Sequence, residues 1–215
     1  MEADLYEEIN GMIQLYLIRH SMTAGNLKKR YIGRTDESLC PEGIVLLESY
    51  IQKNIYPEVQ RVYVSPMKRC METAKLIFKE NFYEVEELRE CDFGIFENKN
   101  YKELSGNGDY QAWIDSNGTL PFPNGESMDA FKSRCLEAFA RIVEEVSGAE
   151  QEWIASGKTG IFRAGIVVHG GTIMAILEQY GYPKAAYFDY QVKNGCGYRL
   201  TPVEGTRLWN CLCLQ

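Results

Sequence analysis

The sequence Leu17-Ile18-Arg19-His20-Ser21-Met22-Thr23 is an apolar run that ends in an arginine and a histidine and is followed by small and polar residues. The protein has only two histidines, and the second, His169, ends a similar run, Val167-Val168, just before Gly170-Gly171. A short apolar run followed by turn residues is typical of the end of a strand. In open α/β sheets, ligands bind beyond the carboxyl ends of the strands. The two histidines are therefore predicted to face one pocket.

Segments with strand patterns and segments with helix patterns alternate along the rest of the chain. Apolar, β-prone runs predict strands at residues 13–19, 61–64, 82–85, 165–168, 198–201 and 208–214. Apolar residues at helical spacing predict helices that begin at Pro41, Pro66, Ser127 and Gly171, the last two ending near Ser147 and Tyr180. This alternation predicts an α/β layer fold.

Length and composition limit the class of protein. A chain of 215 residues fits one domain, residues 1–215, with a modest insertion. A net charge of −7 argues against a nucleic-acid partner. Seven cysteines, an odd number without a Cys-x-x-Cys pair, indicate reduced thiols and a cytoplasmic protein. The acidic first eight residues do not resemble a signal peptide, and no apolar run reaches membrane-spanning length, so no membrane association is expected.

Residues 98–127 form the predicted insertion. They alternate short helical patterns with turns such as Gly106-Asn107-Gly108 and Pro121-Phe122-Pro123-Asn124-Gly125. A long irregular segment of this kind is typical of a lid or a substrate-selecting lobe. Its aromatic residues are mixed with acidic ones, which does not fit a platform for nucleic acid.

Several residues near the two strand ends favour the binding of an anion. An arginine at a strand end is costly to bury without an anionic partner, and the guanidinium of Arg19 matches phosphate oxygens bidentately. Arg69 would supply a second guanidinium from the start of its helix, on the face opposite the apolar stripe. The backbone N–H groups of Gly170-Gly171 open a helix and favour negative charge. Thr23 and Asn26 add neutral donors, and together these residues predict a pocket for a dianionic tetrahedral group.

Such a pocket has a candidate nucleophile in His20, because a neutral imidazole can attack phosphorus. Neighbouring arginines lower an imidazole pKa, and with His169 they would stabilise charge on the equatorial oxygens. An acid must protonate the leaving alkoxide, and sequence position alone leaves Glu90, Asp92 and Glu97 as candidates. Two histidines without a third ligand at suitable spacing are unfavourable for a metal site.

Short motifs recur along nearly the whole chain in a specific order. They are Arg19-His20 with Thr23 and Asn26, Gly33-Arg34-Thr35-Asp36, Ser65-Pro66 with Arg69, Leu88-Arg89-Glu90 with Phe93-Gly94 and Glu97, Gly125-Glu126-Ser127, and Val168-His169-Gly170-Gly171. Each motif alone is a weak signal, but their order and spacing are specific. From about Leu15 to Thr201 the chain resembles the histidine phosphatase superfamily, the phosphoglycerate-mutase-like group.

The resemblance implies a three-layer αβα sandwich with a mostly parallel central sheet and a small helical lid. It implies that His20 is the phosphorylated nucleophile, that Arg19, Arg69 and His169 bind the phosphoryl group, and that Glu90 donates the proton. No metal and no cofactor are implied, and Gly170 joins Thr23 and Asn26 as a substrate-binding residue. The expected partner is a small phosphorylated metabolite, and a homodimer formed through an edge strand or an exposed helix is left open.

The segment Phe93-Gly94-Ile95-Phe96-Glu97 is similar to the branch that includes α-ribazole phosphatase and broad phosphomonoesterases. The mutase branch usually carries more basic residues between the acid and the second histidine, whereas residues 98–127 contain only Lys99 and Lys102. Hydrolysis of a small phosphomonoester, with α-ribazole 5′-phosphate as one candidate, is therefore favoured over phosphoglycerate mutase activity. Ser21 stands where the family usually has glycine, which leaves a third interpretation, a phosphate-binding protein with weak catalysis.

Overall fold

The computed structural model describes residues 13–79 and 82–214, and within them the chain forms a seven-stranded sheet in the order β3-β2-β4-β1-β6-β7-β5. The strands are β1 (Ile13–Arg19), β2 (Arg61–Val64), β3 (Phe82–Glu84), β4 (Phe162–Val168), β5 (Gly181–Tyr182), β6 (Gly197–Pro202) and β7 (Trp209–Leu214). β6 runs antiparallel to both β1 and β7, and the other pairs are parallel. The predicted mostly parallel sheet is confirmed.

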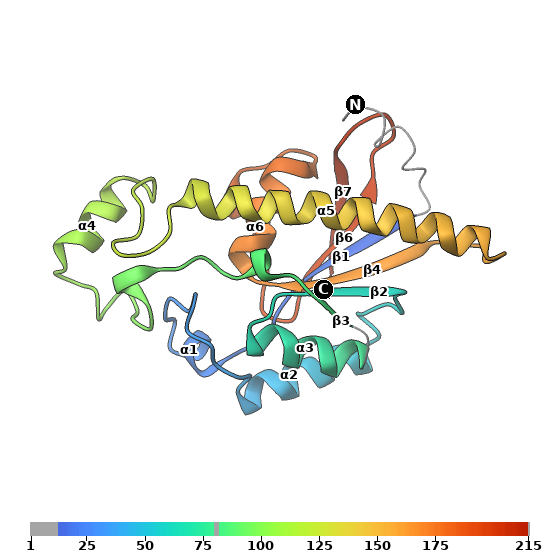
Figure 1. Cartoon of the computed structure of the whole chain (residues 1–215). Helices are drawn as coiled ribbons and strands as arrows, with labels where there is room; N and C mark the ends of the chain where they lie inside the picture. Colours follow the sequence, from blue (N-terminus) through green and yellow to red (C-terminus); the bar gives the residue numbers. More distant parts are fainter. Residues whose placement is uncertain (1–12, 80–81, 215) are drawn as a thin grey trace.

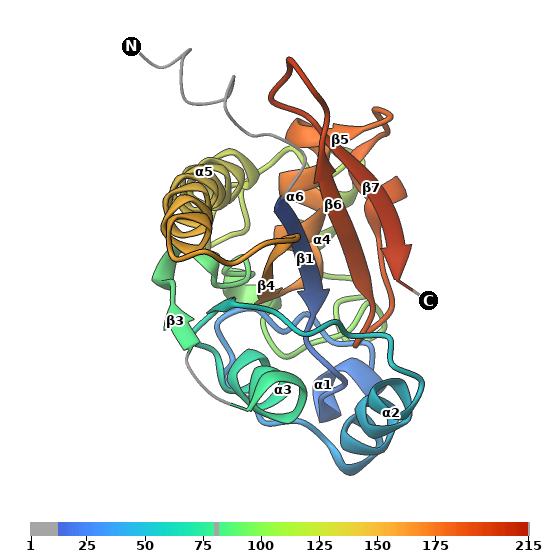
Figure 2. The same cartoon turned by 90° about the vertical axis from the view of Figure 1, so that its right-hand side faces the viewer.

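Helices cover both faces of this sheet, as Figures 1 and 2 show. The α-helices are α1 (Ala24–Leu27), α2 (Pro41–Gln52), α3 (Lys68–Phe78), α4 (Gly108–Asp115), α5 (Met128–Ala155) and α6 (Gly170–Tyr180), and short 3-10 helices are η1 (Glu86–Leu88), η2 (Gly94–Phe96) and η3 (Tyr187–Tyr190). α2 and α3 lie on one face, and α5 and α6 lie on the other. The predicted three-layer sandwich is confirmed, and α4 lies beyond the N-terminal end of α5 (Figure 1).

Strand β1 is central because its side chains are apolar on both faces. Leu15 and Leu17 pack in the core beneath α5 and α6, while Tyr16 and Ile18 pack in the core on the α3 side. Strands buried on both faces read as continuous apolar runs, as this one does. On the β6 side, a Cβ atom on Gly197 would lie 1.8 Å from the Leu17 carbonyl oxygen, so this close strand approach requires glycine.

Two predicted helix boundaries were wrong. The third helix begins at Lys68 rather than Pro66, because Met67 retains an extended backbone and acts as its N-cap. The long helix α5 continues past Ser147 to Ala155, because Ala149 and Trp153 still pack against the core beneath it. Gly148 follows the predicted end, and because its position faces open space it costs the helix only its lower propensity.

No helix in residues 13–79 and 82–214 has the length and hydropathy needed to cross a membrane. The acidic first eight residues lie outside the described part of the chain.

The topology brings the two histidines together at the carboxyl ends of two neighbouring central strands, β1 and β4. β1 and β4 are parallel neighbours with Arg19 opposite Val168, so His20 and His169 follow equivalent positions of adjacent strands. The His20 N–H donates to the Val168 carbonyl oxygen at 2.9 Å, which extends the pairing by one residue. The site predicted at the carboxyl ends of the strands therefore has a structural basis.

Candidate active site

The two imidazoles lie edge to face, with ring centroids 5.3 Å apart and an interplanar angle of 65°. His20 is 4% exposed and His169 is fully buried. Nδ1 of His20 lies 2.7 Å from the Ser21 carbonyl oxygen. A carbonyl oxygen only accepts, so Nδ1 carries the proton and Nε2 of His20 retains its lone pair.

His169 is oriented by a different pair of side chains. Its Nε2 lies 2.8 Å from the Ser65 Oγ and 3.5 Å from the Cys70 Sγ. Ser65 directly follows β2 and Cys70 is in the first turn of α3, so the second imidazole is held by the next element along the sheet.

Burial lowers the pKa of His20 well below its usual range, and the charges of Arg69 and Arg19 lower it further. The pKa of His169 is lowered by burial and by Arg69 in the same way. Burial penalises the charged form of an imidazole and nearby cations add to that penalty. Both rings are therefore neutral at neutral pH, as a histidine nucleophile requires.

Arg19 and Arg69 are held by backbone carbonyl groups rather than by carboxylates. Nη1 of Arg19 donates to the Val192 carbonyl oxygen at 2.7 Å. Arg69 donates to the carbonyl oxygens of Thr35 and Gly33, each at 2.8 Å. Nε of each arginine is shielded from solvent and has no partner. Carbonyl dipoles fix the two guanidinium groups but leave their positive charge uncompensated, which favours binding of an anion.

The position of Arg69 differs in one respect from the expectation. The helical wheel predicted a side chain free to point from the first turn of the helix into a pocket, whereas Arg69 is fully buried under residues 32–35 and is not among the lining residues of the cavity beside His20. Those residues form a loop that packs over the start of α3, a tertiary contact that helical spacing cannot reveal.

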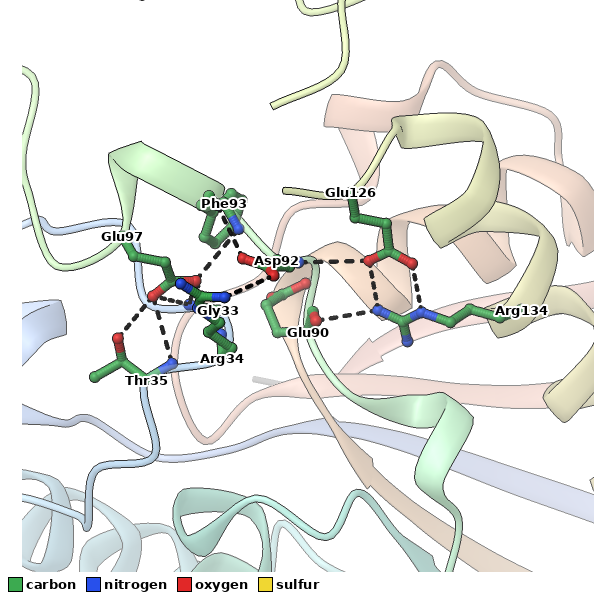
Figure 3. A network of polar contacts seen from close by, with 10 residues as sticks. Gly33, Arg34, Thr35, Glu90, Asp92, Phe93, Glu97, Glu126 and Arg134 are labelled. Carbon is green, nitrogen blue, oxygen red and sulfur yellow. Dashed lines mark hydrogen bonds and ion pairs between the residues drawn. The ribbon is translucent and has the colours of Figure 1, made fainter. Parts of the chain in front are cut away.

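The structure distinguishes the three candidate acids. Asp92 pairs with Arg34 at 3.3 Å and caps Gly94, so it faces the surface. Glu97 accepts backbone N–H groups of the loop at residues 33–35, as Figure 3 shows. Only Glu90 lines the same cavity as His20. Burial raises its pKa, although hydrogen bonds from Cys91 and Gly171 N–H groups oppose the rise.

Glu97 also supports Arg69 indirectly. Oε1 of Glu97 accepts the N–H groups of Gly33 and Arg34 at 3.0 and 2.9 Å, and Oε2 accepts the Thr35 hydroxyl at 2.7 Å. The carbonyl groups of the same loop bind the Arg69 guanidinium. One carboxylate therefore fixes the loop that fixes the arginine.

A second support, which the sequence did not identify, is Arg134 on α5. It forms a bidentate pair with Glu126 at 2.7 and 2.8 Å and donates to the Glu90 carbonyl oxygen (Figure 3). It also donates to the carbonyl oxygens of Glu87 and Arg89. Glu126 belongs to a motif named above, but a lone arginine on a predicted amphipathic helix carries no signal of this role.

Thr23 and Asn26 are placed at the start of α1. The Thr23 hydroxyl accepts the Asn26 backbone N–H, and the Asn26 side-chain Oδ1 accepts the Thr23 backbone N–H, both at 3.2 Å. Asn26 lines the cavity, whereas Thr23 is fully buried. Contact of either residue with phosphate stays a prediction.

The segment at residues 192–196 forms hydrogen bonds to the end of β1 and to the residues that follow it. Asn194 donates its amide to the His20 carbonyl oxygen at 3.1 Å and to the Asn26 Oδ1 at 3.2 Å. Arg19 donates its N–H to the Cys196 carbonyl oxygen at 2.9 Å. Asn194 sits in a turn with no recognisable pattern, so sequence analysis did not single it out.

Ser21 points away from the cavity. Its hydroxyl donates to the Gly43 carbonyl oxygen at 2.6 Å, and its N–H donates to the Thr73 hydroxyl at 3.0 Å. The Ser21 side chain therefore attaches the loop at residues 20–23 to α2. It does not obstruct the cavity that His20 lines.

The cavity has a volume of about 300 Å³. Its polar lining residues include Arg19, His20 and Glu90, and Gly170 lines it as well. Its aromatic and apolar lining residues include Tyr31, Phe93, Trp113, Phe122, Met128, Tyr187 and Phe188. Trp113 and Phe122 come from the predicted insertion at residues 98–127, whose action as a lid stays a prediction.

Within the described residues, no group of three or more His, Cys, Asp or Glu side chains is placed to hold a metal ion.

Two neutral histidines, two arginines and a carboxyl group lie near the carboxyl ends of neighbouring strands, an arrangement that can bind an anion such as phosphate. The model of the histidine phosphatase superfamily, branch 1, matches residues 15–213, and the chain belongs to this family.

Individual relatives agree with this assignment. The chain is 31% identical over 187 residues to the broad-specificity phosphatase YOR283W of Saccharomyces cerevisiae, covering 80% of this chain and 72% of that protein. It is 25% identical over 200 residues to the adenosylcobalamin/alpha-ribazole phosphatase of Salmonella typhimurium, covering 90% and 92%. The fold matches the crystal structure of the alpha-ribazole phosphatase from Shigella flexneri with a TM-score of 0.71 and 22% identity, over 94% and 95% of the two chains.

Proposed function

We propose that this protein is a metal-independent phosphatase that hydrolyses a small phosphomonoester through a phosphohistidine at His20. The observation that carries the proposal is the protonation pattern of His20. Its Nδ1–H is bound to the Ser21 carbonyl oxygen, and its free Nε2 lone pair belongs to a ring kept neutral by burial and by Arg19 and Arg69.

The reaction divides into two displacements at phosphorus. Arg19, Arg69 and His169 bind the phosphoryl oxygens, and Nε2 of His20 attacks phosphorus as the ester P–O bond breaks. Glu90 gives its proton to the departing alkoxide, which leaves as the alcohol. The Glu90 carboxylate then takes a proton from water, which attacks the phosphohistidine. Inorganic phosphate leaves, and His20 and Glu90 return to their starting forms.

Relatives guide the choice of substrates. One is named an adenosylcobalamin/alpha-ribazole phosphatase and another a broad-specificity phosphatase. We propose a small phosphorylated metabolite as the substrate and α-ribazole 5′-phosphate as one member of the panel to be assayed. A cytoplasmic location is part of the same proposal, supported by seven free cysteines, five of them buried.

The test is phosphate release from p-nitrophenyl phosphate, with and without EDTA, by the wild type and by His20→Ala. We expect equal wild-type rates in both conditions and a loss of at least about 10³-fold in the variant, as removal of a covalent nucleophile produces. Acid-labile phosphate should appear on the wild type alone. Equal rates in the two proteins would refute the proposal.

The two other interpretations predict different results. A phosphoglycerate mutase would isomerise 3-phosphoglycerate in the presence of a bisphosphate primer. A binding protein would bind phosphate without turnover. Ser21, which motivated the binding-protein interpretation, directs its hydroxyl to Gly43 rather than into the cavity, which supports catalysis over binding alone.

A further inference from the structure

A second cavity adjoins the first. It has a volume of about 680 Å³ and lies between α4, the start of α5 and η3. Trp113, Met128, Tyr187 and Phe188 line both cavities. The two cavities therefore meet at these four side chains, and together they are called the groove.

The walls of this groove are apolar and partly exposed. Phe188 is 72% exposed and Ile114, which lines the second cavity, is 44% exposed. The Tyr187 and Phe188 rings lie 5.0 Å apart in an edge-to-face arrangement, opposite Trp113 of the 98–127 segment. Contiguous exposed apolar surface beside a catalytic pocket is a mark of a ligand-binding groove.

Among the described residues that line the groove, Arg19 is the only cationic side chain that is not paired with a carboxylate. Arg30 pairs with Glu103 at 2.7 Å, and Lys132 pairs with Glu178 at 2.5 Å. Asp129 adds a negative charge to the second cavity. A carboxylate or a second phosphate on the alcohol portion of a substrate would lose its hydration here without gaining a cation.

We propose that this groove binds the alcohol portion of the substrate, and that this portion is uncharged, bulky and largely apolar or aromatic. This inference rests on the proposed phosphatase activity and deepens it. Phe188 and Trp113 are then specificity-determining residues, which contact the leaving alcohol rather than the phosphoryl group.

The test uses alkyl phosphates whose alcohols differ in size but little in acidity: ethyl, butyl, hexyl and 2-phenylethyl phosphate, with 3-phosphoglycerate as the charged comparison. We expect kcat/KM to rise about threefold to fourfold for each CH₂ that enters the groove, until the groove is filled. 3-Phosphoglycerate should fall below butyl phosphate.

Phe188→Ala should reduce kcat/KM for 2-phenylethyl phosphate about tenfold, and should reduce it much less for ethyl phosphate, whose alcohol is too short to reach that ring. The exposed position of Phe188 means that the variant retains its fold. Tyr101→Ala is the matched control, because Tyr101 is an aromatic residue of the 98–127 segment that is 56% exposed and is absent from both cavity walls. It should leave both values unchanged.

Equal kcat/KM values for all the alkyl phosphates, with clear turnover of ethyl phosphate, would overturn the inference and leave the proposed phosphatase activity standing. So would a preference for 3-phosphoglycerate, or equal behaviour of Phe188→Ala and Tyr101→Ala. If the series is flat and Phe188→Ala also converts a dimer to a monomer, the groove belongs to a second copy of this chain. Absence of turnover with every ester and of phosphate on His20 would instead refute the proposed function.

Discussion

His20 and Glu90 line one cavity with pKa shifts of opposite sign and the same main cause. Burial lowers the pKa of the imidazole below its usual 6.5 and raises that of the carboxyl group above its usual 4.5. Each shift favours the neutral form, which is the form that the proposed nucleophile and the proposed proton donor each require. The proposed mechanism therefore needs a pH at which both groups are neutral.

We predict a pH profile of kcat/KM for ethyl phosphate that falls on the alkaline side as Glu90 loses its proton, and on the acid side as His20 gains one. Glu90→Gln should lower this kcat/KM by about 10²–10⁴-fold and remove the alkaline limb that Glu90 causes. The loss should be much smaller with p-nitrophenyl phosphate, since p-nitrophenolate leaves without a proton. Equal losses with both esters would show that Glu90 is not the acid.

At this scale the residue positions singled out the candidate residues of the site, but they did not choose among the three acids, and only the family resemblance favoured Glu90. The histidines and Arg19 could be found because strand-end position is local information. Glu90, Asp92 and Glu97 are within eight positions of one another and differ only in their tertiary partners. Asn194 could not be found for the same reason, because its role depends on a turn meeting a loop 168 positions away.

Among the elements, α5 connects the core to the acid-bearing segment through Arg134. The Arg134 guanidinium binds three carbonyl oxygens of residues 87–90 and the Glu126 carboxylate. These contacts hold η1 and the residues after it against the helix, which fixes where the Glu90 backbone lies.

We predict that Arg134→Met lowers the free energy of unfolding by about 2–4 kcal/mol, because three carbonyl groups and a partly buried carboxylate lose their donors. Urea denaturation measures this change. The matched control is Arg141→Met on the same helix, whose guanidinium pairs with Glu87 at 2.7 Å while both side chains remain about half-exposed. That variant should lose about 1 kcal/mol or less.

Arg134→Met should also lower kcat/KM for ethyl phosphate more than for p-nitrophenyl phosphate, because displacement of Glu90 affects proton donation first. If the two variants have the same stability and the same ester preference, the contacts of Arg134 do not position the acid.

Element prediction succeeded where the apolar period was strong and failed at boundaries. The helices beginning at Pro41 and Ser127 and the strands β1 and β2 follow from their patterns. The start of α3 and the end of α5 depend on packing, through the extended Met67 and through Trp153 on the core. Local residues do not encode those contacts.

In the molecule as a whole, two guanidinium groups without carboxylate partners and two unprotonated imidazoles lie together near the carboxyl ends of the strands. This arrangement costs folding free energy in the absence of an anion, since like charges are held together away from water. Much of the architecture was predictable from the alternation of strands and helices. The sheet order and the antiparallel β6 were not, because strand pairing joins segments far apart in sequence.

We predict that inorganic phosphate at about 100 times its Kd stabilises the protein by about 2.7 kcal/mol and raises Tm by about 5–10 °C. Thermal unfolding with sodium chloride at the same ionic strength is the control, and it should give a much smaller shift. His20→Ala retains both arginines and should still be stabilised by phosphate. A shift no larger than that in chloride would show that the two arginines do not form an anion site.

The contacts of residues 192–196 with β1 and the loop at residues 20–23 also have a consequence for folding during synthesis. The Arg19 and His20 segment is synthesised well before its partners, which are the carbonyl oxygens of Val168 and Cys196 and the side-chain amide of Asn194. Long-range pairings form late, because the chain between them must first be ordered. A nascent chain that has not reached Cys196 contains His20 but lacks the contacts that position it, so we expect the candidate site to assemble only after this segment has been made.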